Sequence, residues 1–128
     1  MATVKFSVAG VTFENRQEEI KKLSGRESIL IVPEPENSFD KNALAVVAVY
    51  RERLIPIGYV PRKNQEQIMP ALDDENVKGK IVKVARVFDK HDEERSYWYV
   101  IVEIEFMDEW DKMEQYSNKD ISDDLGLS

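Results

Sequence analysis

The sequence predicts a mainly β protein with two short helices, whose antiparallel strands curl into a small barrel with the helices at its ends. Three observations carry this prediction. Short runs rich in apolar and β-branched residues recur along the chain, turn-forming residues separate them, and two segments of helical spacing interrupt them. The length of 128 residues indicates one domain. We expect the element order β-α-β-β-β-α-β-β.

The first strand and the first helix are expected in the N-terminal segment. Residues 4–8 alternate apolar with polar side chains, as a half-buried strand does, and Gly10 ends the run. Residues 13–23 are expected to form a short helix. Asn15 can cap this helix, and Glu18, three positions later, completes a capping box.

Three further strands are expected in the middle of the chain. Residues 28–32, 43–50 and 54–60 are rich in β-branched and other apolar residues, and the charged residues 51–53 form the turn between the last two. Pro56 lies inside the last run. Because proline cannot donate a ladder hydrogen bond, it predicts a sheet edge or a bulge there.

The second helix and the last two strands complete the expected order. Pro61 opens a helix over residues 62–72, which Pro70 should break or kink. Residues 77–88 predict a strand, and residues 96–106 carry the longest strand pattern of the chain. One face of this last strand would carry Trp98, Val100, Val102, Ile104 and Phe106.

Composition restricts the classes of function. The absence of cysteine excludes disulfides, thiolate metal sites and cysteine nucleophiles, and it fits a reducing compartment. No segment approaches the ~20 apolar residues that cross a bilayer, so we expect a cytoplasmic protein without a membrane partner. The net charge of -7 argues against strong, indiscriminate binding to phosphate polymers.

Charge is concentrated at the C-terminus. Residues 109–128 carry six acids and two lysines, a net charge of -4. We expect a β-barrel domain at 1–108 and an acidic C-terminal tail at 109–128, in which Trp110, Met113 and Tyr116 are spaced to form one amphipathic turn. These features support an alternative function, an acidic protein-interaction module that docks on a basic partner.

No enzyme motif is present, so we expect neither catalysis nor a cofactor. The five glycines form no phosphate-binding spacing. His91 lies in a charged loop, where a lone histidine is usually solvent-exposed rather than catalytic or metal-bound. The acidic residues 73–75 follow a helix and are interpreted as a solvated turn rather than a cation site.

The loop at residues 34–42, between two strands, is the most informative segment, and two interpretations of it are open. In the first, its amides and acids satisfy backbone groups and Phe39 packs inward. In the second, the loop is a recognition site. Phe39 would then stack on a ring, Asp40 would accept a hydroxyl hydrogen bond, and Lys41 would contact phosphate.

A second candidate segment follows at residues 57–63. A strand end presents Tyr59, and a helix start then presents Arg62 and Lys63, an arrangement that attracts phosphate. An ordinary strand-to-helix connection with solvated bases explains the same pattern. The aromatic run 97–99 is open to two interpretations too, a stacking platform for single strands or a core with one exposed ring.

Four segments together resemble the HIRAN domain, a small β-barrel module of certain helicase-like remodelers that also occurs as short bacterial and phage proteins. They are residues 8–13, 16–17, 34–46 and 57–62, and the run Glu34-Pro35-Glu36-Asn37-Ser38-Phe39-Asp40-Lys41-Asn42-Ala43 is the most specific. The resemblance is good over residues 4–72. It implies an OB-like or SH3-like barrel that binds single-stranded DNA, with preference for a free 3′-hydroxyl end.

The resemblance also implies roles for individual residues. Phe13 and Phe39 would sandwich the terminal base, and Asp40 would accept a hydrogen bond from the 3′-hydroxyl. Candidate contacts to the DNA backbone are Lys41, Tyr59, Arg62 and Lys63. The chain departs from helicase-associated members at Thr12, where they have arginine, and at Tyr59, where they have histidine. Phenylalanine also replaces both of their stacking tyrosines.

Overall fold

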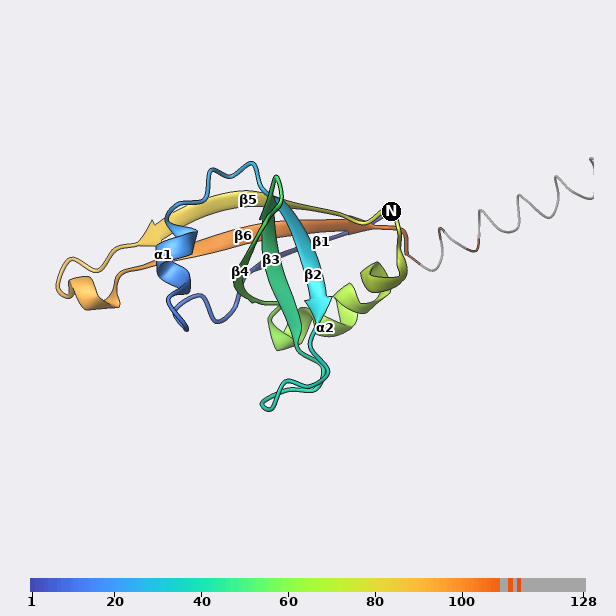
Figure 1. Ribbon diagram of the computed structural model, residues 1–128, viewed down its shortest axis with the longest axis horizontal. Coiled ribbons are helices and arrows are strands. Elements are labelled where there is room, and N and C mark those ends of the chain that lie inside the picture. Colours follow the sequence, from blue (N-terminus) through green and yellow to red (C-terminus); the bar gives the residue numbers. More distant parts are fainter. Residues whose placement is uncertain (109–110, 112, 114–128) are drawn as a thin grey trace, which may run out of the picture.

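The computed structural model describes residues 1–108, 111 and 113, and it confirms the mainly β class. The elements follow the predicted order (Figure 1). The strands are β1 (Ala2–Ser7), β2 (Ser28–Pro33), β3 (Leu44–Tyr50), β4 (Arg53–Tyr59), β5 (Lys78–Val87) and β6 (Tyr97–Phe106). The helices are α1 (Arg16–Ile20) and α2 (Arg62–Ile68), with 3₁₀ helices η1 (Met69–Asp73) and η2 (Glu93–Arg95).

The strands form one antiparallel sheet in the order β1-β6-β5-β2-β3-β4. The sheet bends strongly between β5 and β2, so that β2, β3 and β4 cross the long strands β5 and β6 steeply in Figure 1. β2 and β5 pair at a single position, Ser28 opposite Lys80. Next to it, a Cβ on Gly79 would lie 2.3 Å from the Ile29 carbonyl oxygen, so only glycine fits the bend without displacement.

The two edges of the sheet meet at one end. An isolated bridge joins Ala9 to Tyr59, with reciprocal backbone hydrogen bonds of 2.8 and 2.9 Å. A Cβ on Gly58 would lie 2.2 Å from the Ala9 carbonyl oxygen, so this approach also requires glycine. The predicted barrel is therefore a curled sheet that is fastened at one end and does not close along its length.

The core lies inside the curl. Val100, Val102, Ile104 and Phe106 of β6 are buried and Trp98 is partly buried, which confirms the predicted inner face. Each α-helix inserts a fully buried isoleucine, Ile20 from α1 and Ile68 from α2. Because a buried isoleucine stabilises a fold by about 1.5–3 kcal/mol, these two side chains fix both helices against the sheet.

The N-terminal helix differs from the prediction. It begins at Arg16 rather than near Phe13, and Asn15 makes no side-chain capping bond, so the predicted capping box is wrong. Asn15 and Glu14 have left-handed backbone angles, with φ of 62° and 55°. Such angles end the preceding turn and leave the asparagine side chain unable to cap the helix.

A long-range contact fixes α1 instead of a cap. The Gln17 side-chain amide donates to the Val11 and Trp98 carbonyl oxygens at 2.9 and 2.8 Å, and its oxygen accepts from the Trp98 N–H at 2.7 Å. The helix is thereby tied to the start of β6.

The predicted effects of two prolines are confirmed. β4 carries a bulge, since Val46 pairs with Gly58 and Val47 with Pro56, which leaves the intervening residue unpaired. α2 ends at Ile68, and the chain continues as the 3₁₀ helix η1. The α-helix is thus broken just before Pro70, as predicted. Pro61 precedes α2 in an extended conformation and is not its first helical residue.

The chain leaves β6 beside η1, where the Met107 N–H donates to Asp74 Oδ2 at 2.8 Å. Asp111 and Met113 are the described residues of the predicted acidic tail, and the other residues of its proposed amphipathic turn, Trp110 and Tyr116, lie outside the described residues. Among the described helices, none has the length and hydropathy of a membrane span.

Candidate nucleic-acid interface

The loop between β2 and β3 is folded by its own polar side chains. The Asn37 side-chain oxygen accepts from the backbone N–H of Phe39 at 2.9 Å and of Asp40 at 3.1 Å. Asp40 Oδ1 accepts from the Asn42 N–H at 2.9 Å. These bonds are the expected turn chemistry. They leave Phe39 92% exposed, however, so the expectation that this ring packs inward is wrong.

The turn between β1 and α1 presents the other predicted aromatic. Phe13 N–H donates to Gly10 O at 3.3 Å, and Arg16 N–H donates to Phe13 O at 3.1 Å, so Phe13 sits at the tip of a tight turn. Its side chain is 66% exposed. Phe13 and Phe39 therefore present exposed aromatic rings from two separate loops.

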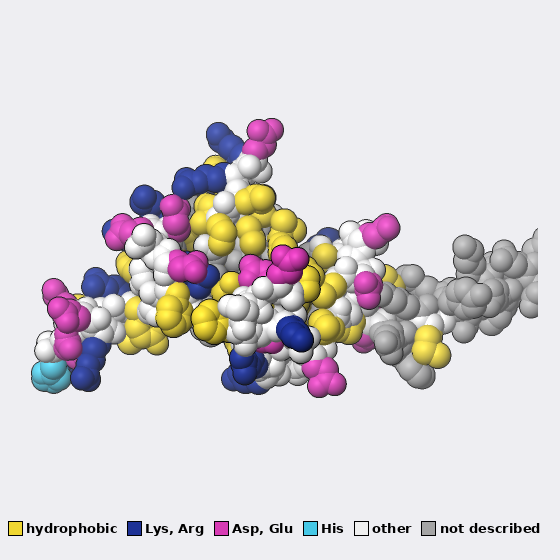
Figure 2. All heavy atoms as spheres, turned by 60° about the horizontal axis from the view of Figure 1, so that its bottom comes forward, with side chains coloured by type: hydrophobic (Ala, Val, Ile, Leu, Met, Phe, Trp, Pro, Cys, Tyr) yellow, Lys and Arg dark blue, Asp and Glu magenta, His cyan; other side chains and the backbone are white. Residues whose placement is uncertain are grey.

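Both rings line one cleft of about 560 Å³, a volume typical of small-ligand sites. The cleft lies at the fastened end of the sheet, between the Gly10–Arg16 turn, the β2–β3 loop and the start of α2. The residues used below are Phe13, Arg16, Phe39, Asp40, Tyr59 and Arg62. On the face toward which this loop projects, hydrophobic side chains gather over the middle, with charges of both signs around them (Figure 2).

Asp40 supplies an ionised carboxylate at the cleft. Its Oδ2 accepts from the Gln65 side-chain amide at 2.8 Å and lies 3.6 Å from Arg62 Nε. The hydrogen bond from Gln65, the one from Asn42 N–H and the charge of Arg62 together hold the pKa of Asp40 below its usual value. The side chain is 20% exposed, so the carboxylate is oriented and still reachable from the cleft.

Tyr59 forms part of the cleft wall through its ring. Its hydroxyl donates to Glu34 Oε1 at 2.8 Å, and this hydrogen bond, with burial, raises the pKa of Tyr59. The Arg16 guanidinium lies over the Tyr59 ring, 5.1 Å from its centroid. Tyr59 is therefore a neutral, fixed surface rather than a mobile donor.

Arg16 is a cleft residue to which the sequence assigned no role. It is buried, its Nη1 donates to Gly10 O at 2.8 Å, and its Nη2 donates to Glu14 Oε2 at 3.3 Å. Gln65, which orients Asp40, was missed as well. Arg16 stands in a segment singled out by motif, but nothing local in the sequence signals that its guanidinium is buried against Tyr59.

The structure brings five of the seven predicted residues together. Phe13, Phe39, Asp40, Tyr59 and Arg62 line the cleft. Lys41 and Lys63 are exposed and are not among its lining residues. Arg62 is itself largely exposed and donates to Phe39 O at 3.4 Å, so it stands at the mouth of the cleft.

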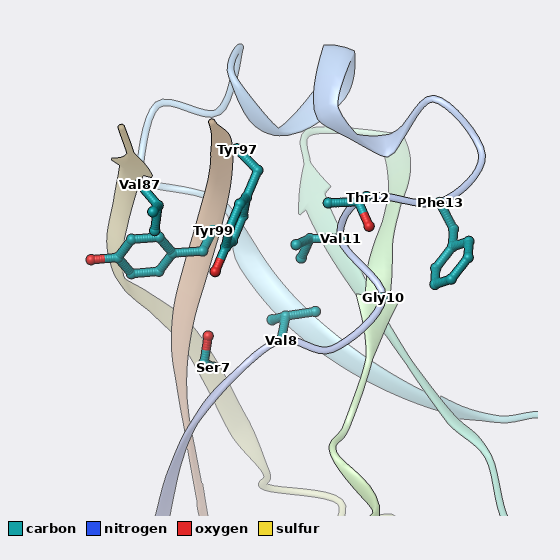
Figure 3. Close-up of a pocket in the computed structure, with 9 residues that line it drawn as sticks. All are labelled: Ser7, Val8, Gly10, Val11, Thr12, Phe13, Val87, Tyr97 and Tyr99. Carbon is teal, nitrogen blue, oxygen red and sulfur yellow. The ribbon is translucent and has the colours of Figure 1, made fainter. Parts of the chain in front are cut away.

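A second cavity of about 630 Å³ adjoins the cleft, and Gly10 and Phe13 line both. Figure 3 shows Tyr97 and Tyr99 of β6 beside Val87 on one side of this cavity, and Phe13 across the loop from them. Trp98 alternates with the two tyrosines and packs against the core. The aromatic run thus combines a core residue with two outward-facing rings.

Other candidate chemistry lies away from the cleft. His91 is exposed in the connection between β5 and β6, at one extremity of the molecule in Figure 2. Within residues 1–108, 111 and 113, no group of three or more acidic or histidine side chains is positioned to hold a metal ion.

Comparison with known proteins identifies one family. No curated protein and no solved structure matches the chain. The family model of the HIRAN domain matches residues 1–105, which include both loops of the cleft and all but the last residue of β6. The chain therefore belongs to the HIRAN domain family, a binding rather than a catalytic domain that recognises nucleic acids at DNA 3′ ends.

Proposed function

We propose that the cleft binds the terminal nucleotide of a single-stranded DNA 3′ end. The terminal base stacks between Phe13 and Phe39, and Asp40 accepts a hydrogen bond from the 3′-hydroxyl. One observation carries the proposal. Two exposed rings from separate loops and an ionised carboxylate line the same cleft. Such a set offers a base two aromatic faces and offers the sugar an acceptor.

The carboxylate accounts for end polarity. Each carboxylate oxygen has two acceptor positions, and Asp40 Oδ1 uses one for the Asn42 N–H. The remaining position suits the hydroxyl of a chain end. A 3′-phosphate would bring negative charge against an ionised carboxylate, which is unfavourable at close range. An internal nucleotide has no free hydroxyl to donate.

The adjoining cavity provides a path for the rest of the strand. A strand whose last base occupies the cleft passes Gly10 and Phe13 and reaches Tyr97 and Tyr99, whose rings offer further stacking. Arg62 at the mouth of the cleft, with Lys41 and Lys63 outside it, supplies positive charge for the phosphates.

The expected affinity is modest. Stacking contributes about 1–3 kcal/mol per base, so the two rings alone give weak binding, and phosphate contacts must supply the rest. Those contacts weaken as salt rises because bound counterions are released on binding. The net charge of -7 lowers affinity further and favours selective over general DNA binding.

Fluorescence anisotropy with short oligonucleotides at two salt concentrations tests the proposal. The oligonucleotides carry a 3′-hydroxyl, a 3′-phosphate, or a hairpin that hides the 3′ end and leaves a free 5′ end. We expect the free 3′-hydroxyl to bind tightest and the affinity to fall with salt. Equal binding of all three ends would overturn the assignment of Asp40.

A further inference from the structure

Arg16 carries a positive charge that is nearly buried, with a side chain 10% exposed. Its Nη1 donates inward to Gly10 O, and its guanidinium covers the Tyr59 ring. The carboxylate that balances it belongs to Glu14, whose side chain is 80% exposed. A buried guanidinium needs an anion, and here the anion is one that can move into solvent without disturbing the core.

The backbone that carries Glu14 is strained. Glu14 and Asn15 both have left-handed φ angles, which side chains with a Cβ rarely adopt in succession. The same turn exposes the Phe13 ring, so strain and a ligand-facing side chain occur together. Strained backbone of this kind persists where the surrounding structure holds it, commonly at binding sites.

The guanidinium lies where the two cavities meet. A Cβ on Gly10 would lie 3.2 Å from Arg16 Nη1 and 3.7 Å from carbon atoms of both Phe13 and Tyr59. Gly10 lines the cleft and the adjoining cavity alike. A strand that occupies both must therefore bring the phosphate between its last two nucleotides close to this point.

We propose that Arg16 is a phosphate receptor of the interface, and that Glu14 occupies its outward N–H until DNA replaces that carboxylate. The proposal rests on the function proposed above. Arginine suits the role because its planar fork can donate to the protein and to a phosphate at the same time. Glu14 then lowers affinity by competing with the phosphate, and it limits binding to ligands that present an anion at this position.

The test compares two exposed acids. Glu14→Gln removes the competing carboxylate, and Glu36→Gln makes the same change of charge on the β2–β3 loop, at a residue that does not line the cleft. With a 3′-hydroxyl oligonucleotide, we expect Glu14→Gln to tighten binding about threefold to fivefold, the range of an exposed ion pair. Glu36→Gln should tighten it less than about twofold through general charge.

A double-mutant cycle isolates the guanidinium. In an Arg16→Gln background, which needs a thermal unfolding check, Glu14→Gln should tighten binding no more than Glu36→Gln does. Arg16→Gln alone should bind the 3′-hydroxyl oligonucleotide more weakly than the wild-type chain does.

The outcomes separate the two proposals. If the wild-type chain binds 3′ ends but Glu14→Gln and Glu36→Gln have equal effects, the receptor role of Arg16 is wrong and the proposed function stands. If neither the wild-type chain nor Glu14→Gln binds any oligonucleotide at low salt, both proposals are wrong. Glu14 is the anion beside a nearly buried guanidinium, so thermal unfolding of both glutamine variants is measured first, and affinities are compared at a temperature where both are folded.

Discussion

Glu27 and Asp40 both accept hydrogen bonds from backbone amides of their own loops, but they differ in how much acceptor capacity is left for a ligand. Between α1 and β2, Glu27 is buried and accepts hydrogen bonds from Ser24 N–H, Ser24 Oγ and Gly25 N–H. Between β2 and β3, Asp40 is partly exposed and faces a cleft. The acceptor positions of the Glu27 carboxylate are occupied by hydrogen bonds from its own turn. The Asp40 carboxylate keeps an acceptor position that a ligand can reach.

The electrostatics of the two groups agree with that difference. Burial alone would raise the pKa of Glu27, but the hydrogen bonds from Ser24 and neighbouring backbone amides outweigh it and lower the pKa. For Asp40, the hydrogen bond from Gln65 is the main cause of a lowered pKa, and it comes from another element, α2. We infer that Glu27 stabilises its own turn, whereas Asp40, which Gln65 orients from α2, remains available to a ligand.

The largest expected effect follows from removing an aromatic ring beside Asp40. Phe39→Ala should weaken binding of a 3′-hydroxyl oligonucleotide about 10-fold to 100-fold, since stacking supplies about 1–3 kcal/mol per base. Anisotropy titration measures the change. Phe88→Ala is the matched control, because Phe88 is also exposed but does not line the cleft. Equal losses for both variants would mean that exposed rings contribute without a specific pocket.

Glu27→Gln tests whether Glu27 contributes to the stability of the fold and not to DNA binding. The glutamine leaves some donors of the turn unsatisfied, so the free energy of unfolding should fall by about 1–3 kcal/mol, while DNA affinity of the folded protein stays unchanged. Chemical denaturation measures the first and anisotropy the second. A variant that is fully stable but loses DNA affinity would reverse the roles assigned to the two carboxylates.

The same substitution has a defined pH dependence. The folded-state pKa of Glu27 is lowered, so its stabilisation is fully present above its ordinary pKa of 4.5 and is lost as the pH falls through the lower folded-state value. The stability difference between wild type and Glu27→Gln should therefore be constant from neutral pH down to about 5 and shrink below the ordinary pKa. A difference that shrinks between pH 7 and 5 would contradict this.

Asp40→Asn tests whether the Asp40 carboxylate recognises the 3′ end. The folded protein should lose little stability, since most of its hydrogen bonds can be remade by the amide. Discrimination between a 3′-hydroxyl and a 3′-phosphate should fall by about fivefold to tenfold, because one charge repulsion at this partly exposed, solvent-accessible site is worth about 1 kcal/mol. Retention of full discrimination would assign end recognition to another group.

The smallest expected effect concerns the acids at the C-terminal end of the sequence. Residues 114–128 carry four acids and one lysine, a net charge of -3, and deleting them leaves Asp111 in its ion pair with the N-terminus. DNA affinity should rise about twofold at low salt and not at all at high salt, since only the general field changes. A large change at high salt would show that the tail acts directly on the interface.

Local patterns were sufficient to predict most of the fold. The alternation in β6 depends on a period of two, and the effects of Pro56 and Pro70 follow from a missing N–H, so neighbouring residues determine all three. The start of α1 was misplaced because Glu14 and Asn15 adopt left-handed backbone angles, and the helix is held by Gln17, which bonds to Trp98 far along the chain. A contact between residues so far apart in sequence cannot be predicted from local spacing.

The site was predictable only in part for the same reason. Phe39 and Asp40 lie on one loop, and their motif marks them. Arg16 depends on Tyr59, which the Ala9–Tyr59 bridge brings to it across the sheet. Lys63 follows Arg62 on a helix, where successive residues point about 100° apart, so one lines the cleft and the other does not.

The bridge between Ala9 and Tyr59 has a consequence for dynamics. It holds together two strands that begin and end far apart in sequence, with a pair of hydrogen bonds and a glycine contact. Local opening at this point would separate the Phe13 turn from the wall formed by Tyr59 without unfolding the core. The exchange rates of these two amide protons should therefore report whether the interface is assembled, and ligand should slow them before it slows any proton in β5 or β6.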